Sequence, residues 1–495
     1  MNKISAFLLI IISSSIIALT RYPLPIVSLL IFIAYIPLYH FLMVKRSGKE
    51  ILLAGTLFGA FYNIIALHWI SLVTLPGYLG MFFLFTAYFS LSFLLINRIS
   101  EHFKKIKPLI FILFFISFEY LQNFGEFSFP WFNAGYSLAE HLTLIQIADI
   151  GGVFFISFMI LVVNMLIYQL IKRFNIYRLL MLFLIFGIWI SYGKYRLNTL
   201  DMKKTTTDIS VIQGDIDLDI KWNKAFMDSS ISIYKELTLK SVNENSSSLS
   251  IWPESAVTYY LLKDYKIKHN LSNFAIKNKT NIFTGFQDYK PAPGENPEGY
   301  KFYNAASQIT RKGIIQKPYY KKNLVPFGER MPFLKIFPIL WKVQMGQANF
   351  ERGEHFTTFK LDDKYKYSSV ICFEIAFPLF IRKFEGIDFL VNLTNDAWFH
   401  RSVGTYQHAV MAKFRAIEIR KQVFRAANTG YSLIVLPTGE ILKSTDLYEK
   451  RFIHSNLFVC KEKTLFTKIL YLFPFTLLLL SGIIFVVYLK KIIIG

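Results

Sequence analysis

The sequence predicts a multi-pass α-helical membrane protein, with about eight transmembrane helices, that carries one water-soluble α/β domain. Composition is the first reason, because 53% of the 495 residues are hydrophobic, only 18% are charged and the mean hydropathy is +0.38. A soluble protein carries about 25% charged residues. The second reason is that the apolar residues form blocks of about 20 residues, the length that crosses a bilayer. The third is the region 194–464, whose alternating sequence is interrupted by Gly and Asn, as in a soluble α/β domain.

The apolar blocks define the membrane helices in order. Seven precede the soluble region and one follows it, at 4–20, 23–44, 50–70, 77–97, 108–123, 152–171, 177–193 and 465–489. We therefore expect a seven-helix transmembrane domain over 1–193, a soluble domain over 194–464, and a C-terminal helix with a short cytoplasmic tail over 465–495. The first block also resembles a signal peptide, but Pro23 leads directly into the second block and no small-residue cleavage site is evident.

The positive residues predict the orientation. The short loops on one side of the helices hold nearly all of their Lys and Arg residues, and such loops are cytoplasmic. Arg21 alone lies on the other side, opposite Lys3, Lys45, Arg46, Lys49, Arg98, Lys104, Lys105, Lys107, Lys172, Arg173, Arg178, Lys490 and Lys491. Both termini are thus expected in the cytoplasm and the soluble domain on the extracytoplasmic, periplasmic face. The net charge of +22 on an apolar chain indicates an anionic membrane surface as partner and no nucleic acid.

Three chemically reactive residues follow strand-like runs in the soluble region. Glu254, Lys321 and Cys372 come after the runs 249–252, 307–320 and 367–371. The carboxyl ends of strands are where α/β folds gather catalytic groups. A carboxylate can take the proton of a thiol, and an ammonium can stabilise both the thiolate and an oxyanion. If Cys372 begins a helix, as the following FEIAF permits, the helix N-terminus would favour the thiolate further.

Each of these residues also has a plain structural interpretation. A lone Cys after a strand is commonly a small buried hydrophobic residue, Lys321 has a charged neighbour in Lys322, and Glu254 resembles a helix-start carboxylate. With two cysteines the chain has no cysteine-rich zinc site, and the proposed chemistry needs no metal or other cofactor. His400 and His408 lack metal-ligand neighbours, so we expect them to be surface or structural residues.

Longer motifs decide between these interpretations. WPES at 252–255, YKKNLVPFGE at 320–329, ICFE at 371–374 and TNDAWF at 394–399 occur in the order and spacing of the nitrilase, or carbon–nitrogen hydrolase, superfamily. With the membrane helices and FPWFNAGYS at 129–137, the whole chain resembles the bacterial apolipoprotein N-acyltransferase family. The resemblance implies that the soluble domain is a nitrilase-like αββα sandwich.

The resemblance also implies roles for individual residues. Glu254 would be the general base, Lys321 the stabiliser of the oxyanion and Cys372 the nucleophile. Lys321 is chosen over its neighbour because the family's catalytic lysine lies three residues before the Leu of LVPFGE, here Leu324. The implied supporting residues are Glu329, which would orient the lysine, and Glu374, Asn304, Trp222 and Asn395.

The chain departs from the family pattern at three positions. Phe373 stands where a Tyr is common, Gln122 where an Arg is common and His400 where a Gly is frequent. These departures leave the three expected catalytic residues in place.

The implied activity is the last step of lipoprotein maturation. An acyl chain would pass from a phospholipid donor to the α-amine of the N-terminal diacylglyceryl-cysteine of a lipoprotein, by a ping-pong mechanism through a thioester on Cys372. The expected location is the bacterial cytoplasmic (inner) membrane. The partners would be the phospholipid, the diacylglyceryl-lipoprotein acceptor and the bilayer, with the enzyme a monomer.

Two other functions remain open at this stage. One is hydrolysis of a small amide or nitrile by an enzyme whose membrane helices only anchor it, although one helix would suffice for an anchor. The other is a transporter or lipid-binding module, although intramembrane charges are few and Glu119 is the clearest. The apolar stretch 331–345 is either a mobile lid that dips into the membrane interface or an ordinary core helix.

Overall fold

The computed structural model describes residues 3–334, 336–342, 349–384 and 386–494. The chain divides into two compact units, Met1–Thr199 with Thr464–Gly495, and Leu200–Lys463. Residues 335 and 343–345 of the apolar stretch 331–345 lie outside the described residues, so its expected role as a lid or core helix stays a prediction. In its described part, Pro338–Lys342 is a short 3-10 helix.

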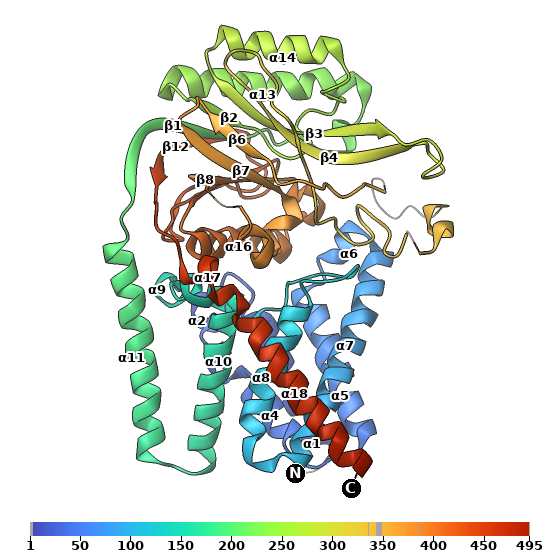
Figure 1. Cartoon of the computed structure of the whole chain (residues 1–495), viewed down its shortest axis with the longest axis vertical. Helices are drawn as coiled ribbons and strands as arrows, with labels where there is room; N and C mark the ends of the chain where they lie inside the picture. The colour runs from blue at the N-terminus through green and yellow to red at the C-terminus, as the bar shows by residue number, and fades with distance from the viewer. Residues whose placement is uncertain (1–2, 335, 343–348, 385, 495) are drawn as a thin grey trace. The chain divides into compact units, whose positions relative to one another are not determined.

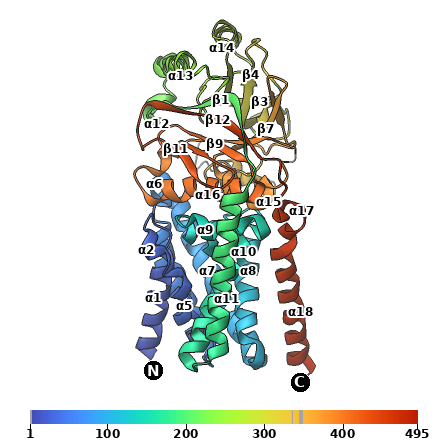
Figure 2. The same ribbon diagram turned by 90° about the vertical axis from the view of Figure 1, so that its left-hand side faces the viewer.

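The first unit is entirely helical (Figure 1). Its helices are α1 (Lys3–Leu19), α2 (Pro25–Ser28), α3 (Ile31–Ala34), α4 (Ile36–Leu42), α5 (Gly48–Ala66), α6 (Ile70–Val73), α7 (Leu75–His102), α8 (Lys107–Leu121), α9 (Leu142–Ile145), α10 (Ala148–Lys172), α11 (Ile176–Thr199), α17 (Leu465–Lys468) and α18 (Phe473–Ile494). In Figure 2 the long helices of this unit run in a common direction, as in a bundle.

Six apolar segments among the described residues are long enough to cross a membrane. They are Pro25–Leu42, Gly48–Ala66, Leu75–His102, Ala148–Lys172, Ile176–Thr199 and Leu470–Ile493. The predicted multi-pass helical class is therefore confirmed, whereas the count of eight spans is not. The helices α1, with 17 residues, and α8, with 15, account for the difference because both are shorter than a typical span.

Small residues allow a close helix contact in this unit, between α5 and α7. A Cβ atom at Gly55 would lie 2.3 Å from the Cα of Ser90, and one at Gly59 would lie 2.8 Å from the Cα of Thr86. Close packing of backbones through small residues is a principal source of helix association in a bilayer. Elsewhere, the hydroxyls of Ser117 on α8 and Ser481 on α18 are 2.9 Å apart and join the C-terminal helix to the rest of the unit.

The second unit contains two six-stranded sheets. The first has the order β12-β1-β2-β3-β4-β5 and the second β11-β10-β9-β8-β7-β6. The strands are β1 (Lys203–Gln213), β2 (Leu249–Ile251), β3 (Asn281–Pro291), β4 (Tyr300–Ile309), β5 (Tyr319–Tyr320), β6 (Thr358–Leu361), β7 (Tyr365–Ile371), β8 (Phe389–Thr394), β9 (Gln422–Ala427), β10 (Leu433–Val435), β11 (Ile441–Ser444) and β12 (Arg451–Val459). In each sheet three neighbouring strands are parallel, β1 with β2 and β3, and β7 with β8 and β9.

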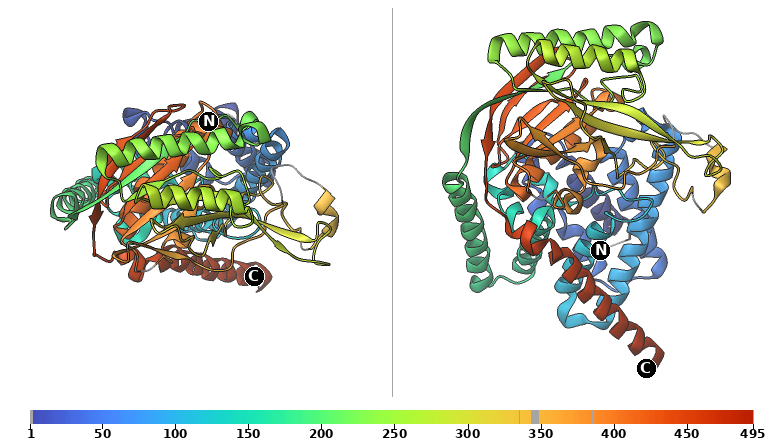
Figure 3. Two further views of the ribbon diagram at one scale, coloured as in Figure 1. Left: turned by 90° about the horizontal axis from the view of Figure 1, so that it is seen from above. Right: turned by 45° about the horizontal axis from the view of Figure 1, so that its top comes forward.

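Helices cover the outer faces of both sheets. In Figure 3, α13 (Lys224–Asn245) and α14 (Tyr265–Lys277) lie side by side over the first sheet, and α16 (Val403–Ile419) packs against β9 and β10 of the second. Aromatic residues fill the space between the sheets: Phe283 contacts Phe359 and Tyr367, with ring centroids 4.9 and 5.3 Å apart. The unit is the αββα sandwich that the motifs predict.

Candidate active site

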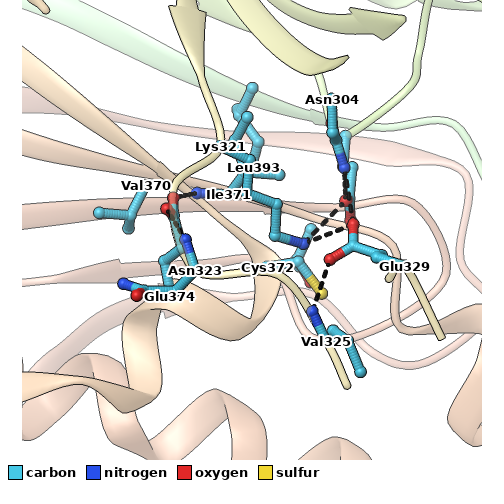
Figure 4. A network of polar contacts seen from close by, with 12 residues as sticks. Asn304, Lys321, Asn323, Val325, Glu329, Val370, Ile371, Cys372, Glu374 and Leu393 are labelled. Atoms are coloured by element: carbon cyan, nitrogen blue, oxygen red, sulfur yellow. Dashed lines mark hydrogen bonds and ion pairs between the residues drawn. The ribbon is translucent and has the colours of Figure 1, made fainter. Parts of the chain in front are cut away.

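The three residues expected to be catalytic lie at strand ends that meet within the second unit. Glu254 follows β2, Lys321 follows β5 of the same sheet, and Cys372 follows β7 of the other sheet. Figure 4 shows Lys321 and Cys372 pointing toward each other, with Asn304 and Glu329 beside them. Glu254 and Cys372, which are more than a hundred positions apart in the sequence, are thus brought together because the two sheets pack against each other.

Lys321 is held between two carboxylates. Its Nζ lies 2.8 Å from Oε1 of Glu329 and 3.6 Å from Oε1 of Glu254, and its side chain is 1% exposed. The amide of Asn304 donates to both carboxylates, at 2.7 Å to Glu254 and 3.0 Å to Glu329. Glu329 is fixed further because the backbone N–H of Val325 donates to its other oxygen at 2.9 Å.

The charges of this cluster decide the protonation states. Burial on its own would lower the pKa of Lys321, but the charges of Glu329 and Glu254 raise that pKa well above its ordinary value. Lys321 is therefore a permanent cation at neutral pH. Burial, followed by the charge of Glu254, raises the pKa of the Cys372 thiol, although Lys321 acts in the opposite direction. The resting nucleophile is a neutral thiol that needs a base.

Cys372 begins a helix, as the sequence permits, but the helix is short and of the 3-10 type. Cys372–Ala376 is a five-residue 3-10 helix, and Cys372 itself has a φ of +51°, in the left-handed region. A single short turn has little of the dipole that favours a thiolate, so any stabilisation by this helix N-terminus would be small, and the expectation stays a prediction. A Cβ-bearing residue in this region is strained and persists only when its surroundings hold it.

Glu374 is one element that holds this turn. Its carboxylate accepts hydrogen bonds from the backbone N–H groups of Ile371, Lys322 and Asn323 at 2.8, 2.7 and 3.1 Å, and from the hydroxyl of Tyr319 at 2.8 Å. Burial raises the pKa of Glu374 to about 7 in spite of these donors. The side chain therefore ties the segment before the nucleophile to the segment after the lysine (Figure 4).

The other expected supporting residues lie in different surroundings. Oδ1 of the buried Asn395 accepts a hydrogen bond from Nδ2 of Asn428 at 3.3 Å, and Asn428 also binds the backbone of Ile216. Trp222 is 37% exposed, unlike the buried Lys321 and Glu254. Phe373, at the position of the common Tyr, packs its ring against Phe377 with centroids 5.0 Å apart.

Two buried residues beside the site were not predicted from the sequence. Nε2 of His408, on α16, lies 3.1 Å from the carbonyl oxygen of Cys372 and the residue is buried, so of the two expected alternatives, a surface or a structural residue, the structure excludes the first. Lys221 is fully buried, donates from Nζ to the carbonyl of Glu254 at 3.2 Å, and has its pKa lowered to about 8 by burial. No group of three or more His, Cys, Asp or Glu side chains within the described ranges is arranged to hold a metal ion.

Comparison with known proteins assigns both units. Residues 13–166 match the family model of the apolipoprotein N-acyltransferase N-terminal domain, and residues 210–456 match that of carbon-nitrogen hydrolases. An apolipoprotein N-acyltransferase from Geobacter metallireducens is 31% identical over 472 residues, covering 91% of this chain and 89% of the relative. The enzyme of the same name from Aquifex aeolicus is 33% identical over 349 residues, covering 68% and 74%.

An amidase from Nesterenkonia sp. aligns with 55% of this chain and 95% of its own, at 14% identity and a TM-score of 0.40.

Proposed function

Because the chain belongs to the apolipoprotein N-acyltransferase family and is an acyltransferase, we propose that it moves a fatty acyl chain from a phospholipid to the α-amine of an N-terminal diacylglyceryl-cysteine of a lipoprotein. The observation that carries the proposal is the buried cluster in which Lys321 faces Glu254, Glu329 and Cys372. In this cluster a neutral thiol, a carboxylate and a permanent cation occupy one site.

In the first half-reaction, the phospholipid loses an acyl chain to the enzyme. Glu254 accepts the proton of the Cys372 thiol as sulfur attacks the ester carbonyl. The ammonium of Lys321 stabilises the oxyanion that forms. The C–O bond to glycerol then breaks, the alkoxide takes the proton from Glu254, and a lysophospholipid leaves. The product on the enzyme is an acyl thioester.

In the second half-reaction, the amine of the lipoprotein attacks the thioester. Glu254 takes a proton from the attacking nitrogen, the new amide forms as the carbon–sulfur bond breaks, and the leaving thiolate of Cys372 receives that proton from Glu254. A thioester is reactive enough for aminolysis without ATP or coenzyme A. The ping-pong order therefore needs only the three side chains, and Asn304 and Glu329 keep Lys321 in place.

The membrane unit gives both lipid substrates a route to the enzyme in the plane of the bilayer. We propose that the enzyme lies in the cytoplasmic membrane with both termini in the cytoplasm and the catalytic unit on the periplasmic face, as its short-loop cations favour. Trp222 and Asn395 belong in this proposal as substrate-positioning and supporting residues, respectively.

The test is mass spectrometry of the purified full-length protein after incubation with a phospholipid of one known acyl chain. We expect a hydroxylamine-labile acyl group on the peptide that contains Cys372. Cys460→Ala is the matched control and should load normally, whereas Cys372→Ala, Glu254→Gln and Lys321→Ala should not load. An unloaded wild type, or a loaded Cys372→Ala variant, would overturn the mechanism.

A second measurement separates transfer from hydrolysis. The loaded enzyme should keep its acyl group in buffer and lose it as an amide when a diacylglyceryl-cysteine peptide is added. Loss as free fatty acid at the same rate without the peptide would identify a hydrolase instead.

A further inference from the structure

A buried polar cluster lies against the backbone carbonyl of the nucleophile. It consists of His408 on α16, Asp396 after β8, Arg425 on β9 and Thr394 at the end of β8, each of them 1% exposed or less. The proposed mechanism gives none of these residues a role. We propose that His408 is a positioning residue that holds the carbonyl of Cys372 and so maintains the strained conformation of the nucleophile; this rests on the proposed function of Cys372.

The hydrogen bonding of the ring supports this assignment. Nε2 of His408 lies 3.1 Å from the carbonyl oxygen of Cys372, and a carbonyl oxygen only accepts. Nε2 must therefore carry a proton, whatever the charge of the ring. At the other side of the ring, Nδ1 lies 2.9 Å from Oδ1 of Asp396 and 3.1 Å from Nη2 of Arg425. Both ring nitrogens are thus engaged and the ring orientation is fixed.

The groups behind the ring are themselves held in place. Nη2 of Arg425 donates to Oδ2 of Asp396 at 2.6 Å, and the hydroxyl of Thr394 donates to Oδ1 at 2.8 Å. Both strands that carry Thr394 and Arg425 lie in the centre of the second sheet. The histidine is therefore supported by a rigid part of the fold, as precise positioning of a catalytic group requires.

The backbone around Cys372 is consequently held on both sides. Glu374 accepts from the N–H of Ile371 before the nucleophile, and His408 donates to the peptide group after it. Between these two hydrogen bonds Cys372 has its φ of +51°, a conformation that a residue with a Cβ disfavours. Without the second hydrogen bond, the peptide group after Cys372 can rotate, and the sulfur moves away from Lys321.

The experiment compares four variants of the full-length protein in detergent and phospholipid. His408→Leu removes the donor, His408→Gln retains an N–H donor at similar reach, and His408→Asn is too short to reach the carbonyl. Met411→Ala is the matched control, because Met411 is fully buried on the same helix. The readouts are the single-turnover rate of acyl loading, the phospholipid concentration that gives half of the maximal rate, and the thermal unfolding midpoint.

We expect the maximal loading rate of His408→Leu and His408→Asn to fall by about 100-fold, the order of loss caused by a misplaced reactive group. The half-saturating phospholipid concentration should stay unchanged, and His408→Gln should recover most of the rate. Met411→Ala should lower the unfolding midpoint without slowing loading. A wild-type rate in His408→Leu or His408→Asn, or a His408→Gln rate as low as that of His408→Asn, would overturn the proposal.

A readout that needs no acyl donor separates this proposal from the proposed function. In a Cys460→Ala background, the rate of Cys372 alkylation by iodoacetamide should change in His408→Leu and His408→Asn and be restored in His408→Gln. If the wild type fails to load but this pattern holds, the function is wrong and the positioning role stands. If the wild type loads but neither loading nor alkylation responds to the His408 variants, the positioning role alone is wrong. If His408→Leu does not fold, the comparison of His408→Gln with His408→Asn provides the same test.

Discussion

At the residue scale, the amide of Asn304 separates two carboxylates that face one ammonium. It donates to Glu254 and Glu329, while the ammonium of Lys321 lies 3.6 and 2.8 Å from oxygens of the same two carboxylates. Replacing Asn304 by Asp exchanges a donor for a third acceptor. Two carboxylates at hydrogen-bonding distance repel each other or share a proton.

The first prediction concerns this amide. Asn304→Asp should reduce the rate of acyl loading by about 1,000-fold. The three neighbouring carboxyl groups would then share a proton, and a protonated Glu254 cannot act as the general base. Asn304→Ala, which adds no charge, should reduce it less. Loading rates measured by mass spectrometry check both variants, and equal rates in the two would contradict the electrostatic explanation.

The second prediction concerns pH and Glu374. Its pKa in the folded protein is raised to about 7, above the ordinary value of a glutamate. The folded protein therefore binds more protons than the unfolded chain at mildly acidic pH. The contribution of this group to stability is complete below about pH 4 and is lost as the pH rises through about 7.

Glu374→Gln is the variant that tests this dependence, because it cannot ionise. The unfolding midpoint of the wild type, relative to that of Glu374→Gln, should fall steadily from about pH 5 to about pH 8. Tryptophan fluorescence during heating of the detergent-solubilised protein measures both midpoints. A difference that does not change with pH would show that Glu374 does not titrate in this range.

Local motifs predicted the site residues that lie close together in the sequence. They did not predict residues that reach the site only through the folding of distant segments. Cys372 and Glu374 share one motif, and Lys321 and Glu329 share another, so one short pattern identifies each pair. His408 is 36 residues from the carbonyl that it contacts. All of α16 except Tyr406 is buried, so no polar face distinguishes the histidine from its neighbours. It reaches the nucleophile because α16 packs against the segment Cys372–Ala376.

At the scale of the elements, the contact between α5 and α7 depends on the absence of a side chain. A Cβ on Gly55 would meet backbone atoms of Ser90 at 2.3 and 2.7 Å, and backbone cannot move aside cheaply. Gly187 on α11 is a natural comparison, because nothing lies within 4 Å of a Cβ placed there.

The third prediction uses this pair of glycines. Gly55→Ala should separate α5 from α7 and reduce the yield of monodisperse protein severalfold, whereas Gly187→Ala should leave it unchanged or slightly raise it, because alanine favours helix. Size-exclusion chromatography in detergent measures the yield. A normal elution profile for Gly55→Ala would show that the helices can move apart without loss of folding.

Hydropathy predicted the positions of the membrane helices, although not their details. The second apolar block is divided into α2, α3 and α4; Pro25 is the first residue of α2 and Pro37 the second residue of α4. Proline is accepted in a first turn but interrupts a helix that reaches it from the N-terminal side. The apolar composition of a block does not reveal such breaks, and it does not reveal that α8 is too short for a typical span.

At the scale of the whole molecule, the orientation of the chain in the membrane is open to a direct test. The fourth prediction is that a cysteine at Glu298, exposed in the loop between β3 and β4, reacts with a membrane-impermeant maleimide in intact spheroplasts. A cysteine at Lys105, exposed between α7 and α8, should react only after lysis. Each cysteine is introduced into a variant that lacks the native Cys372 and Cys460. The reverse labelling pattern would show that the chain has the opposite topology.

The first sheet also determines when the catalytic unit can fold during its synthesis. β1 begins at Lys203, and its antiparallel partner β12 ends at Val459, close to the end of the soluble unit. One side of β1 thus stays unpaired until almost the whole unit has left the ribosome. An open strand edge is prone to aggregation, so the growing chain needs protection during this interval. Folding of the catalytic unit therefore waits for a strand that is synthesised only a few residues before α18.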